Sequence, residues 1–284
     1  MTDTLTVARW AVETVGYSSH AEGHSSRESE RATRGLQAGA TVAVKIAMLN
    51  VGWFTAPAGI FRAGDELDRT VRFPVPAYVI ETATERILID TGLNPSAIAD
   101  PAGYYDRPDI FGVFALEQEQ SVADQIDVDT LTKVVLTHLH WDHVGGLQLI
   151  PASVPVVIQR SEWQAGHDDT AVQRNAFIPR DYASDGREVM LMDGDCDLLG
   201  DGSIELLLTP GHTPGHQSIR IGELVLGADV THYASGLDDH RFPMFADDHE
   251  QQGHSADRLR ALRDAGANVI PGHDPEILRP GPLS

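Results

Sequence analysis

Cysteine is almost missing from this 284-residue chain, which contains only Cys196. An intrachain disulfide is therefore excluded, which fits a reducing cytoplasm without excluding export. Cys196 lies in the acidic stretch 193–197, whose charges disfavour a thiolate, and we interpret it as structural. We expect a cytoplasmic protein whose fold depends on its hydrophobic core.

Positive charge and long apolar runs are also scarce. The chain has 21 Lys and Arg against 42 Asp and Glu, which gives a formal net charge of −21. Nucleic acids and anionic membranes are bound mainly through Lys and Arg, so neither is an expected partner. No apolar run approaches the ~20 residues of a membrane helix. Arg9 interrupts the apolar stretch that a signal peptide would need near the N-terminus.

The first 40 residues differ in composition from the rest of the chain. They are polar, with too little apolar surface to offset the entropy lost on ordering, so we predict an N-terminal arm over residues 1–40 that is disordered. His20 and His24 have a spacing that could share a metal on a helix, but the Ser and Gly around them favour a mobile tail. We predict that residues 41–284 form a single domain, for which a hydrophobic fraction of 42% is ordinary.

Strand and helix patterns mix within each half of that domain. This mixture predicts an α/β fold in which two mixed β-sheets are covered by helices. The irregular stretch 94–120 is either a binding loop or an insertion that only packs, and residues 52–61 are expected to form a loop. Apolar runs predict strands at 41–51, 75–81, 86–90, 133–136, 154–159, 189–192, 203–209, 217–221, 223–226 and 268–270, and helices are predicted at 121–126, 161–165 and 251–265.

The stretch 137–146 carries the strongest chemical signal. Directly after the apolar run 133–136 it places three histidines and one aspartate within six residues, in a chain with only 13 histidines. Imidazole and carboxylate are the ligands that a divalent metal such as zinc prefers. A polar, His-rich surface loop is the alternative, but the density of such groups favours a metal site. The candidate ligands in this stretch are His138, His140, Asp142 and His143.

Three isolated groups, His212, Asp229 and His273, follow the ends of later predicted strands. Pro-Gly precedes both histidines and fixes where each imidazole points. One catalytic zinc takes three protein ligands and a water, and two metals ~3.5–4 Å apart can act together on one substrate. Seven groups therefore suit two metals with one shared carboxylate, although this count does not say which residue binds which metal.

The series His-x-His-x-Asp-His followed by isolated His, Asp and His resembles the metallo-β-lactamase superfamily over residues 42–273. The resemblance implies an αββα sandwich with two divalent metal ions, zinc by default, at one edge between the sheets. By this resemblance the first metal is bound by His138, His140 and His212, the second by Asp142, His143 and His273, and Asp229 bridges them.

The ligand set also narrows the choice within that superfamily. The β-lactamases of the superfamily usually have cysteine at the position of Asp229, and its flavodiiron proteins have glutamate at the position of His140. Its glyoxalase-II-type thioesterases carry a further domain, for which the 11 residues after His273 leave no room. Nucleases of the family carry basic extensions, against which the net charge of −21 argues. The chain is most similar to the N-acyl-homoserine lactonases and their phosphotriesterase and arylsulfatase-like relatives. A metal-binding domain without catalysis is the alternative of a different class.

The resemblance implies a dinuclear metal-dependent hydrolase in which a metal-bridged hydroxide attacks the carbonyl of a small-molecule lactone or similar ester. Asp142 would then pass a proton to the leaving alkoxide. In the best-known lactonases a tyrosine three residues after the bridging aspartate holds the substrate carbonyl. Here that position is His232 and Tyr233 follows it, so either could donate this hydrogen bond. A homodimer is an open alternative to a monomer.

Other polar groups near the motifs have simpler interpretations. His216 is expected to stabilise its turn or a ligand, Trp141 to pack, and Asp90 either to orient a ligand histidine or to cap a turn. The loops 52–73, 94–120 and 233–245 are expected to form the pocket walls. In the acidic segment 238–254 we expect solvated side chains at His240, His249 and His254.

Overall fold

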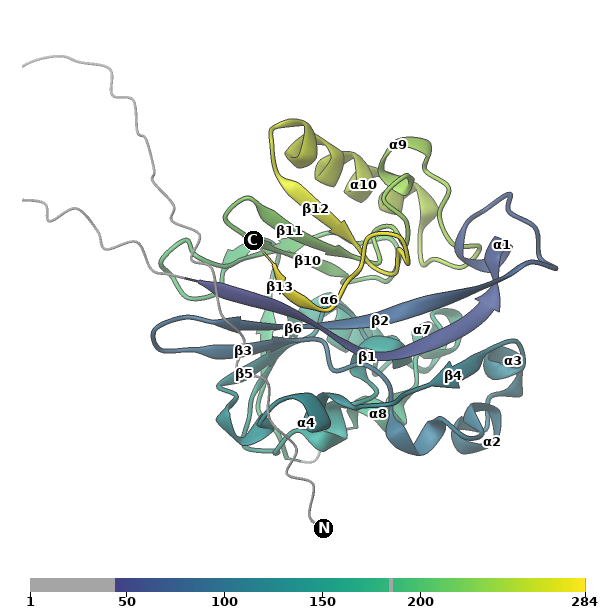
Figure 1. Ribbon diagram of the computed structural model, residues 1–284, viewed down its shortest axis with the longest axis horizontal. Helices are drawn as coiled ribbons and strands as arrows, with labels where there is room; N and C mark the ends of the chain where they lie inside the picture. Colours follow the sequence, from purple (N-terminus) through teal and green to yellow (C-terminus); the bar gives the residue numbers. More distant parts are fainter. Residues whose placement is uncertain (1–43, 184–185, 284) are drawn as a thin grey trace, which may run out of the picture.

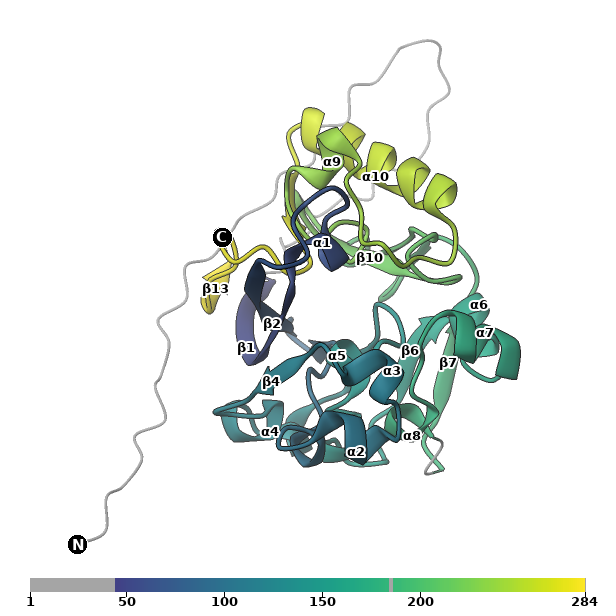
Figure 2. The same ribbon diagram turned by 90° about the vertical axis from the view of Figure 1, so that its right-hand side faces the viewer.

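A computed structural model describes residues 44–183 and 186–283. Two β-sheets face each other, and helices cover the outer face of each (Figure 1, Figure 2). The predicted α/β sandwich is therefore confirmed. The predicted arm over residues 1–40 and the first three residues of the first predicted strand lie outside the described residues.

The first sheet has the strand order β13-β1-β2-β3-β5-β6-β7, with β4 also paired to β1. Strands β3, β5, β6 and β7 run parallel to one another, whereas β1 pairs antiparallel with β2. The bounds are β1 (Lys45–Pro57), β2 (Thr70–Glu81), β3 (Arg86–Ile89), β4 (Ala115–Glu117), β5 (Lys133–Val135), β6 (Val156–Gln159), β7 (Val189–Met192) and β13 (Gly281–Leu283).

The loop predicted at residues 52–61 is wrong, because β1 continues to Pro57 and the helix α1 (Ala58–Phe61) follows it directly. The pairing of β1 with β2 shifts register between Asn50 and Trp53, and Gly52 has a φ of +148° at that point. A β-bulge absorbs the extra residue and lets the strand bend without ending. The sequence showed the glycine but not the partner strand that continues beside it.

The second sheet has the order β12-β11-β10-β9-β8, and only β11 and β12 are parallel. Helix α10 (His249–Asp264) covers its outer face (Figure 1), where Ala256 and Leu259 are buried with Val225. The bounds are β8 (Cys196–Asp197), β9 (Glu205–Leu208), β10 (Gln217–Ile221), β11 (Leu224–Ala228) and β12 (Asn268–Pro271). Cys196 is half-buried, and burial together with Asp195 and Asp197 raises the pKa of its thiol, which agrees with a structural role.

The facing sides of the two sheets form one apolar core, which includes Ile89 and Val135 of the first sheet and Ile219 and Leu226 of the second. A larger core under the first sheet is built around Phe54 and contains most of the aromatic residues. Fully burying one such side chain stabilises the fold by roughly 1.5–3 kcal/mol. The two sheets are thereby held face to face, which fixes the strand ends that carry the polar motifs.

Three short helices lie in the stretch 94–120, with a proline in the first turn of each. Tyr105 and Phe111 of this stretch are buried in the larger core. The helix predicted at 121–126 is present and begins with a capping box formed by Ser121 and Asp124. The remaining elements are α1 (Ala58–Phe61), η1 (Pro95–Ala97), α2 (Pro101–Tyr105), α3 (Pro108–Phe111), α4 (Val122–Gln125), η2 (Val128–Thr130), α5 (Trp141–Val144), η3 (Leu147–Leu149), α6 (Arg160–Ala165), α7 (Asp169–Arg174), α8 (Pro179–Tyr182) and α9 (Gly236–Asp239). Within the described ranges, none of these helices is long and apolar enough to cross a membrane.

Candidate metal centre

The seven groups singled out in the sequence meet at one edge of the sandwich. They lie on the loops that follow β5, β9, β11 and β12 and on the short helix α5, so both sheets contribute to the site. All seven side chains are buried, and their ligand atoms fall into two clusters, while a third group joins Asp229 and His273 to His232. The residues of these clusters are His138, His140, His212 and Asp229 in the first, and Asp142, His143 and His273 in the second.

In the first cluster, which we call site 1, three imidazole nitrogens converge. His140 Nδ1 lies 3.0 Å from His138 Nε2 and 2.9 Å from His212 Nε2. The Oδ2 atom of Asp229 lies 3.4 Å from His212 Nε2 and 3.9 Å from His138 Nε2. Two ligands ~2.0–2.1 Å from a tetrahedral zinc lie roughly 3.3–3.4 Å apart, so site 1 needs only small adjustments to hold such an ion.

The second cluster, site 2, lies on the other side of Asp229. His143 Nε2 and His273 Nε2 are 3.2 Å apart, and Asp142 Oδ2 is 3.8 Å and 3.5 Å from them, respectively. The Oδ1 atom of Asp229 lies 3.4 Å from His143 Nε2 and 3.2 Å from His273 Nε2. One oxygen of Asp229 therefore faces each site, which is the geometry that a bridging carboxylate requires.

Oxygen atoms hold the outer ring nitrogens of four of the five histidines. The Nδ1 atom of His138 lies 3.0 Å from Thr137 Oγ1, and that of His273 lies 2.8 Å from the Pro74 carbonyl oxygen. His140 uses its Nε2 atom, 2.8 Å from the Asn175 carbonyl oxygen, and therefore turns Nδ1 toward site 1. Such outer contacts fix the ring orientation and the tautomer of a metal ligand.

Asp90 fixes the orientation of the His143 ring. Its Oδ2 atom lies 2.7 Å from His143 Nδ1, and its two oxygens also accept hydrogen bonds of 2.7 Å from the amide and the hydroxyl of Thr137. Of the two roles expected for Asp90, this contact agrees with the orientation of a candidate ligand histidine, and Asp90 also holds the start of the 137–146 loop. The backbone of Asp90 has a φ of +57°, a conformation that costs free energy in a non-glycine residue.

His216 and Gly272 determine where Asp229 sits. His216 Nε2 accepts a hydrogen bond of 3.1 Å from the Asp229 amide, while its Nδ1 atom lies 3.1 Å from the Thr209 carbonyl oxygen. His216 thus helps to position Asp229, which is a candidate ligand. A Cβ atom at Gly272 would lie 2.4 Å from Asp229 Oδ1, so any larger residue there would collide with the bridging group.

The charges of the cluster suit a cation. Burial, followed by the neighbouring histidines, holds the pKa of His138 and His212 well below the ordinary value, so both rings are neutral and have a lone pair to donate. Burial opposes the ionisation of Asp229, but His273, His232 and His143 hold its pKa well below the ordinary value. Asp229 Oδ1 is buried without a hydrogen-bond partner among the described residues. The neutral nitrogens of His138 and His212, which face Oδ2 of the ionised Asp229, fit a divalent metal ion at site 1.

The two adjacent candidates for the substrate carbonyl, His232 and Tyr233, lie in different surroundings. His232 is buried with Nε2 3.3 Å from Asp229 Oδ2, and burial lowers its pKa to about 3, so its ring is neutral. The ring of Tyr233 packs against Phe73, and the Arg62 guanidinium lies 5.8 Å from its centroid. Burial raises the pKa of Tyr233 to about 12. The structure therefore brings His232 to the metal ligands, whereas Tyr233 belongs to the neighbouring apolar wall.

Aromatic side chains that the sequence did not single out surround the centre. The ring centroid of Phe61 lies 5.0 Å from that of His232 and 6.0 Å from that of Phe114. Phe245, which is 38% exposed, lies 5.9 Å from the ring of His212 and 5.6 Å from that of Phe61. Phe61 and Phe114 lie on two of the loops expected to form pocket walls, and Phe245 lies at the end of the third. Trp141 packs within the same aromatic group, as predicted.

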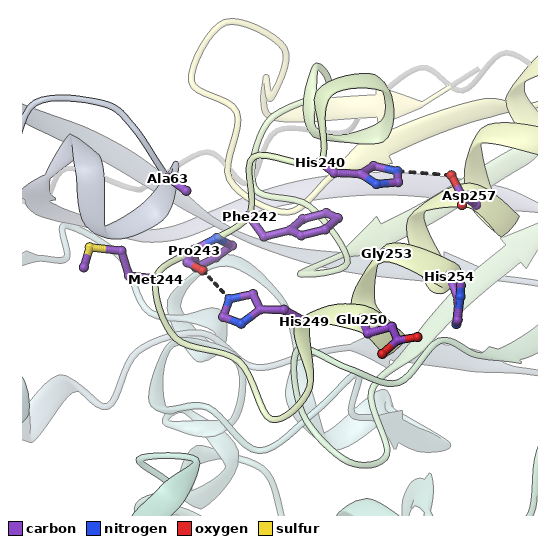
Figure 3. Close-up of a pocket in the computed structure, with 10 residues that line it drawn as sticks. All are labelled: Ala63, His240, Phe242, Pro243, Met244, His249, Glu250, Gly253, His254 and Asp257. Carbon is purple, nitrogen blue, oxygen red and sulfur yellow. Dashed lines mark hydrogen bonds and ion pairs between the residues drawn. The ribbon is translucent and has the colours of Figure 1, made fainter.

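A separate surface hollow of ≈ 640 Å³ lies beside α10 and contains none of the seven ligands (Figure 3). The three histidines that we expected to be solvated line it, and all three are exposed. His240 Nε2 lies 3.1 Å from Asp257 Oδ1, and His249 Nε2 lies 2.9 Å from the Pro243 carbonyl oxygen.

Comparisons with known proteins agree with this geometry. The family model described as the metallo-beta-lactamase superfamily matches residues 70–273. The chain is similar to N-acyl homoserine lactonase AttM of Azorhizobium caulinodans, with 29% identity over 218 residues, which is 72% of this chain and 82% of that protein. It is also similar to N-acyl homoserine lactonase AiiA of Bacillus thuringiensis subsp. kurstaki, with 26% identity over 73% of this chain and 84% of that protein.

Solved structures share the fold. An N-acyl homoserine lactone hydrolase with N-hexanoyl-L-homoserine bound at its catalytic metal centre superposes with a TM-score of 0.72 and 23% identity, covering 82% of this chain and 94% of that one. AidC, a dizinc quorum-quenching lactonase, gives a TM-score of 0.62 and 18% identity over 82% of this chain and 87% of that one. With a family model that spans most of the chain and a buried His and Asp centre that fits divalent metal, this protein belongs to the metallo-beta-lactamase superfamily.

Proposed function

We propose that this protein is a metal-dependent hydrolase that opens the ring of an N-acyl homoserine lactone or a similar lactone. The observation that carries the proposal is the complete set of seven buried ligands in two clusters, with one oxygen of Asp229 facing each. The lactonases AttM and AiiA, to which the chain is similar over more than 70% of its length, support the choice of substrate.

Two zinc ions are the proposed metals. His138, His140 and His212 would hold one, Asp142, His143 and His273 the other, and Asp229 both. When bound, such a pair supplies a water acidic enough to attack near neutral pH, together with an electrophile for the carbonyl. Imidazole and carboxylate also suit other divalent metals, so metal analysis of the purified protein decides the identity.

The remaining catalytic roles are proposed for side chains of the protein. Asp142 is the proposed proton carrier, which would take the proton released by the attacking water and pass it to the leaving alkoxide, because its buried carboxylate lies beside His143 and His273 of site 2. The hydrogen bond to the developing oxyanion is proposed to come from the loop after β11, which carries His232 and Tyr233. The neutral His232 ring, which is the nearer of the two to the ligands, is the first candidate. The aromatic wall that includes Phe61 and Phe245 would exclude water and hold the acyl chain.

The test compares four substrates with the metal-loaded protein: an N-acyl homoserine lactone, an aryl ester, a phosphotriester and a sulfate ester. Proton release on ring opening should be fastest for the lactone, should disappear after treatment with a chelator and should return with zinc. The His140→Ala variant serves as the inactive control. Preference for the phosphotriester or the sulfate ester would replace the proposed substrate, and a metal-loaded protein inert to all four would indicate a binding domain.

Three predictions about the protein as a whole stay proposals. They are a cytoplasmic location, a disordered arm over residues 1–40 before a single domain, and an assembly state for which a homodimer is the alternative to a monomer. Fractionation of cells, limited proteolysis of the full chain and light scattering, respectively, test them.

A further inference from the structure

Glu162 is a buried carboxylate outside the ligand set. It lies on α6 (Arg160–Ala165), directly after β6, and its side chain is completely buried. It belongs to neither of the two clusters of ligand atoms. A buried carboxylate is costly to keep in a fold unless its oxygens are well satisfied, so its partners indicate what it does.

Its two oxygens join two separate loops. Oε1 accepts a hydrogen bond of 3.0 Å from the Leu139 amide, and Oε2 accepts one of 2.8 Å from the Gly215 amide. Leu139 lies between the ligands His138 and His140, and Gly215 lies three residues after the ligand His212. All three histidines of site 1 therefore lie within three residues of an amide that this one carboxylate holds. Of the two histidines of site 2, His143 lies four residues beyond Leu139 on α5, where Asp90 holds its ring, and His273 lies on neither loop.

The loops also press closely against α6. A Cβ atom at Gly215 would lie 2.2 Å from the Glu162 amide nitrogen, and one at Gly166 would lie 2.4 Å from Leu139 Cδ1. Glycine at these positions lets both loops approach the helix until their amides reach the carboxylate. Close packing of the loops on the helix therefore fixes the contact, which does not depend on a flexible side chain that spans a gap.

Glutamate is the residue type that this contact requires. Each of its two oxygens accepts from a main-chain N–H group that would otherwise be buried without a partner. Glutamine has the same shape but offers one accepting oxygen, and its NH₂ group would face an N–H. Burial raises the pKa of Glu162 to about 7, because the buried surroundings disfavour the ionised carboxylate. The fold retains the group despite this cost.

We propose that Glu162 is the positioning residue of site 1, which holds the 137–146 loop and the 210–216 loop at the separation that lets His138, His140 and His212 bind one metal. The inference rests on the metal binding of the proposed function and goes beyond it by making one site, and not the other, depend on α6. Glu162 acts through the main chain, without touching a metal or substrate.

The test measures zinc affinity by competition with a chromophoric chelator, in Glu162→Gln and in two backgrounds that each keep one site. His273→Ala disables site 2, and His212→Ala disables site 1. Loss of a supporting group around a metal typically weakens binding by about 10- to 100-fold. We expect Glu162→Gln to weaken zinc by that factor in the His273→Ala background and to leave the affinity unchanged in the His212→Ala background.

Asp181→Asn is the matched control. Asp181 is also a buried carboxylate, but it accepts its side-chain hydrogen bonds from Asn94 and Tyr105, which lie outside both metal loops. Its isosteric change should leave zinc affinity at site 1 unaltered, and circular dichroism should show that each metal-free variant is folded. Unchanged affinity of Glu162→Gln in both backgrounds, or equal weakening in both, would overturn the inference alone. Failure of the unaltered protein to bind zinc would overturn the proposed function as well.

Discussion

Asp229 gives the sharpest prediction, because its two oxygens face different sites. Oδ1 lies 3.2 Å from His273 Nε2 of site 2, and Oδ2 lies 3.4 Å from His212 Nε2 of site 1. Asp229→Ala removes a ligand from both sites at once. Asp229→Asn keeps one oxygen of similar position and replaces the other with an NH₂ group that cannot bind a metal. The first variant should therefore weaken both metals, and the second should weaken one.

The expected size follows from the ligand count. Structural zinc sites with four ligands bind with roughly 10–16 kcal/mol, so one ligand in four is worth about 2.5–4 kcal/mol. Since about 1.4 kcal/mol is a factor of ten, each weakened site should lose roughly two to three orders of magnitude in affinity. Competition titration against a chromophoric chelator resolves two binding steps and gives both constants. The His273→Ala variant, which should affect one step only, is the control.

The Asp229→Ala variant tests whether Asp229 bridges the two sites. If Asp229→Ala weakened a single binding step while the other kept its affinity, Asp229 would not bridge, and the assignment of one shared carboxylate would be wrong. Lactone hydrolysis should fall together with metal content, and excess zinc should restore it only in part, because the second metal would be held without its shared ligand.

The remaining predictions concern pH and the apolar wall. Burial raises the pKa of Asp181 from 3.8 to about 6, so this carboxyl stabilises the fold below pH 4 and that contribution is lost as the pH rises through 6. The free energy of unfolding of metal-free Asp181→Asn, relative to the unaltered protein, should therefore rise by about 2 kcal/mol between pH 4 and pH 7 in urea titrations, whereas a constant difference would contradict the shift. Phe245→Ala should raise KM for a long-chain acyl lactone by roughly fivefold, equivalent to about 1 kcal/mol of lost apolar contact, with kcat little changed. An equal effect on a short-chain lactone in steady-state assays would show that the ring does not contact the chain.

Much of the candidate site could be read from the sequence, because its residues have rare chemistry at strand ends. His138, Asp229 and His273 are a metal-binding type of residue directly after apolar runs, and the carboxyl ends of strands that run in the same direction lie at the same edge of a sheet. The strands themselves followed from apolar periodicity, and the predicted hairpin at 75–90 corresponds to β2 and β3.

What the sequence could not provide depends on partners that are distant along the chain. Strand β13 has only three residues and exists because it pairs with β1, more than 200 positions earlier. Glu162 appears in the sequence as an ordinary helix residue, and only the docking of two loops on α6 reveals its burial. Phe245 lies in a stretch whose apolar residues have no period, so its position beside His212 could not be inferred.

The way both sites combine residues from the two sheets has a consequence for the entropy of the unfolded chain. His143 and His273, which meet at site 2, are 130 positions apart. A covalent cross-link that closes a loop of that size stabilises a fold by about 4–5 kcal/mol in the chain-entropy model. With a single cysteine, this chain has no disulfide to provide such a cross-link, and a bound metal takes its place as a reversible one. The availability of metal, more than the redox state, is then the chemical variable that determines how much this cross-link stabilises the fold.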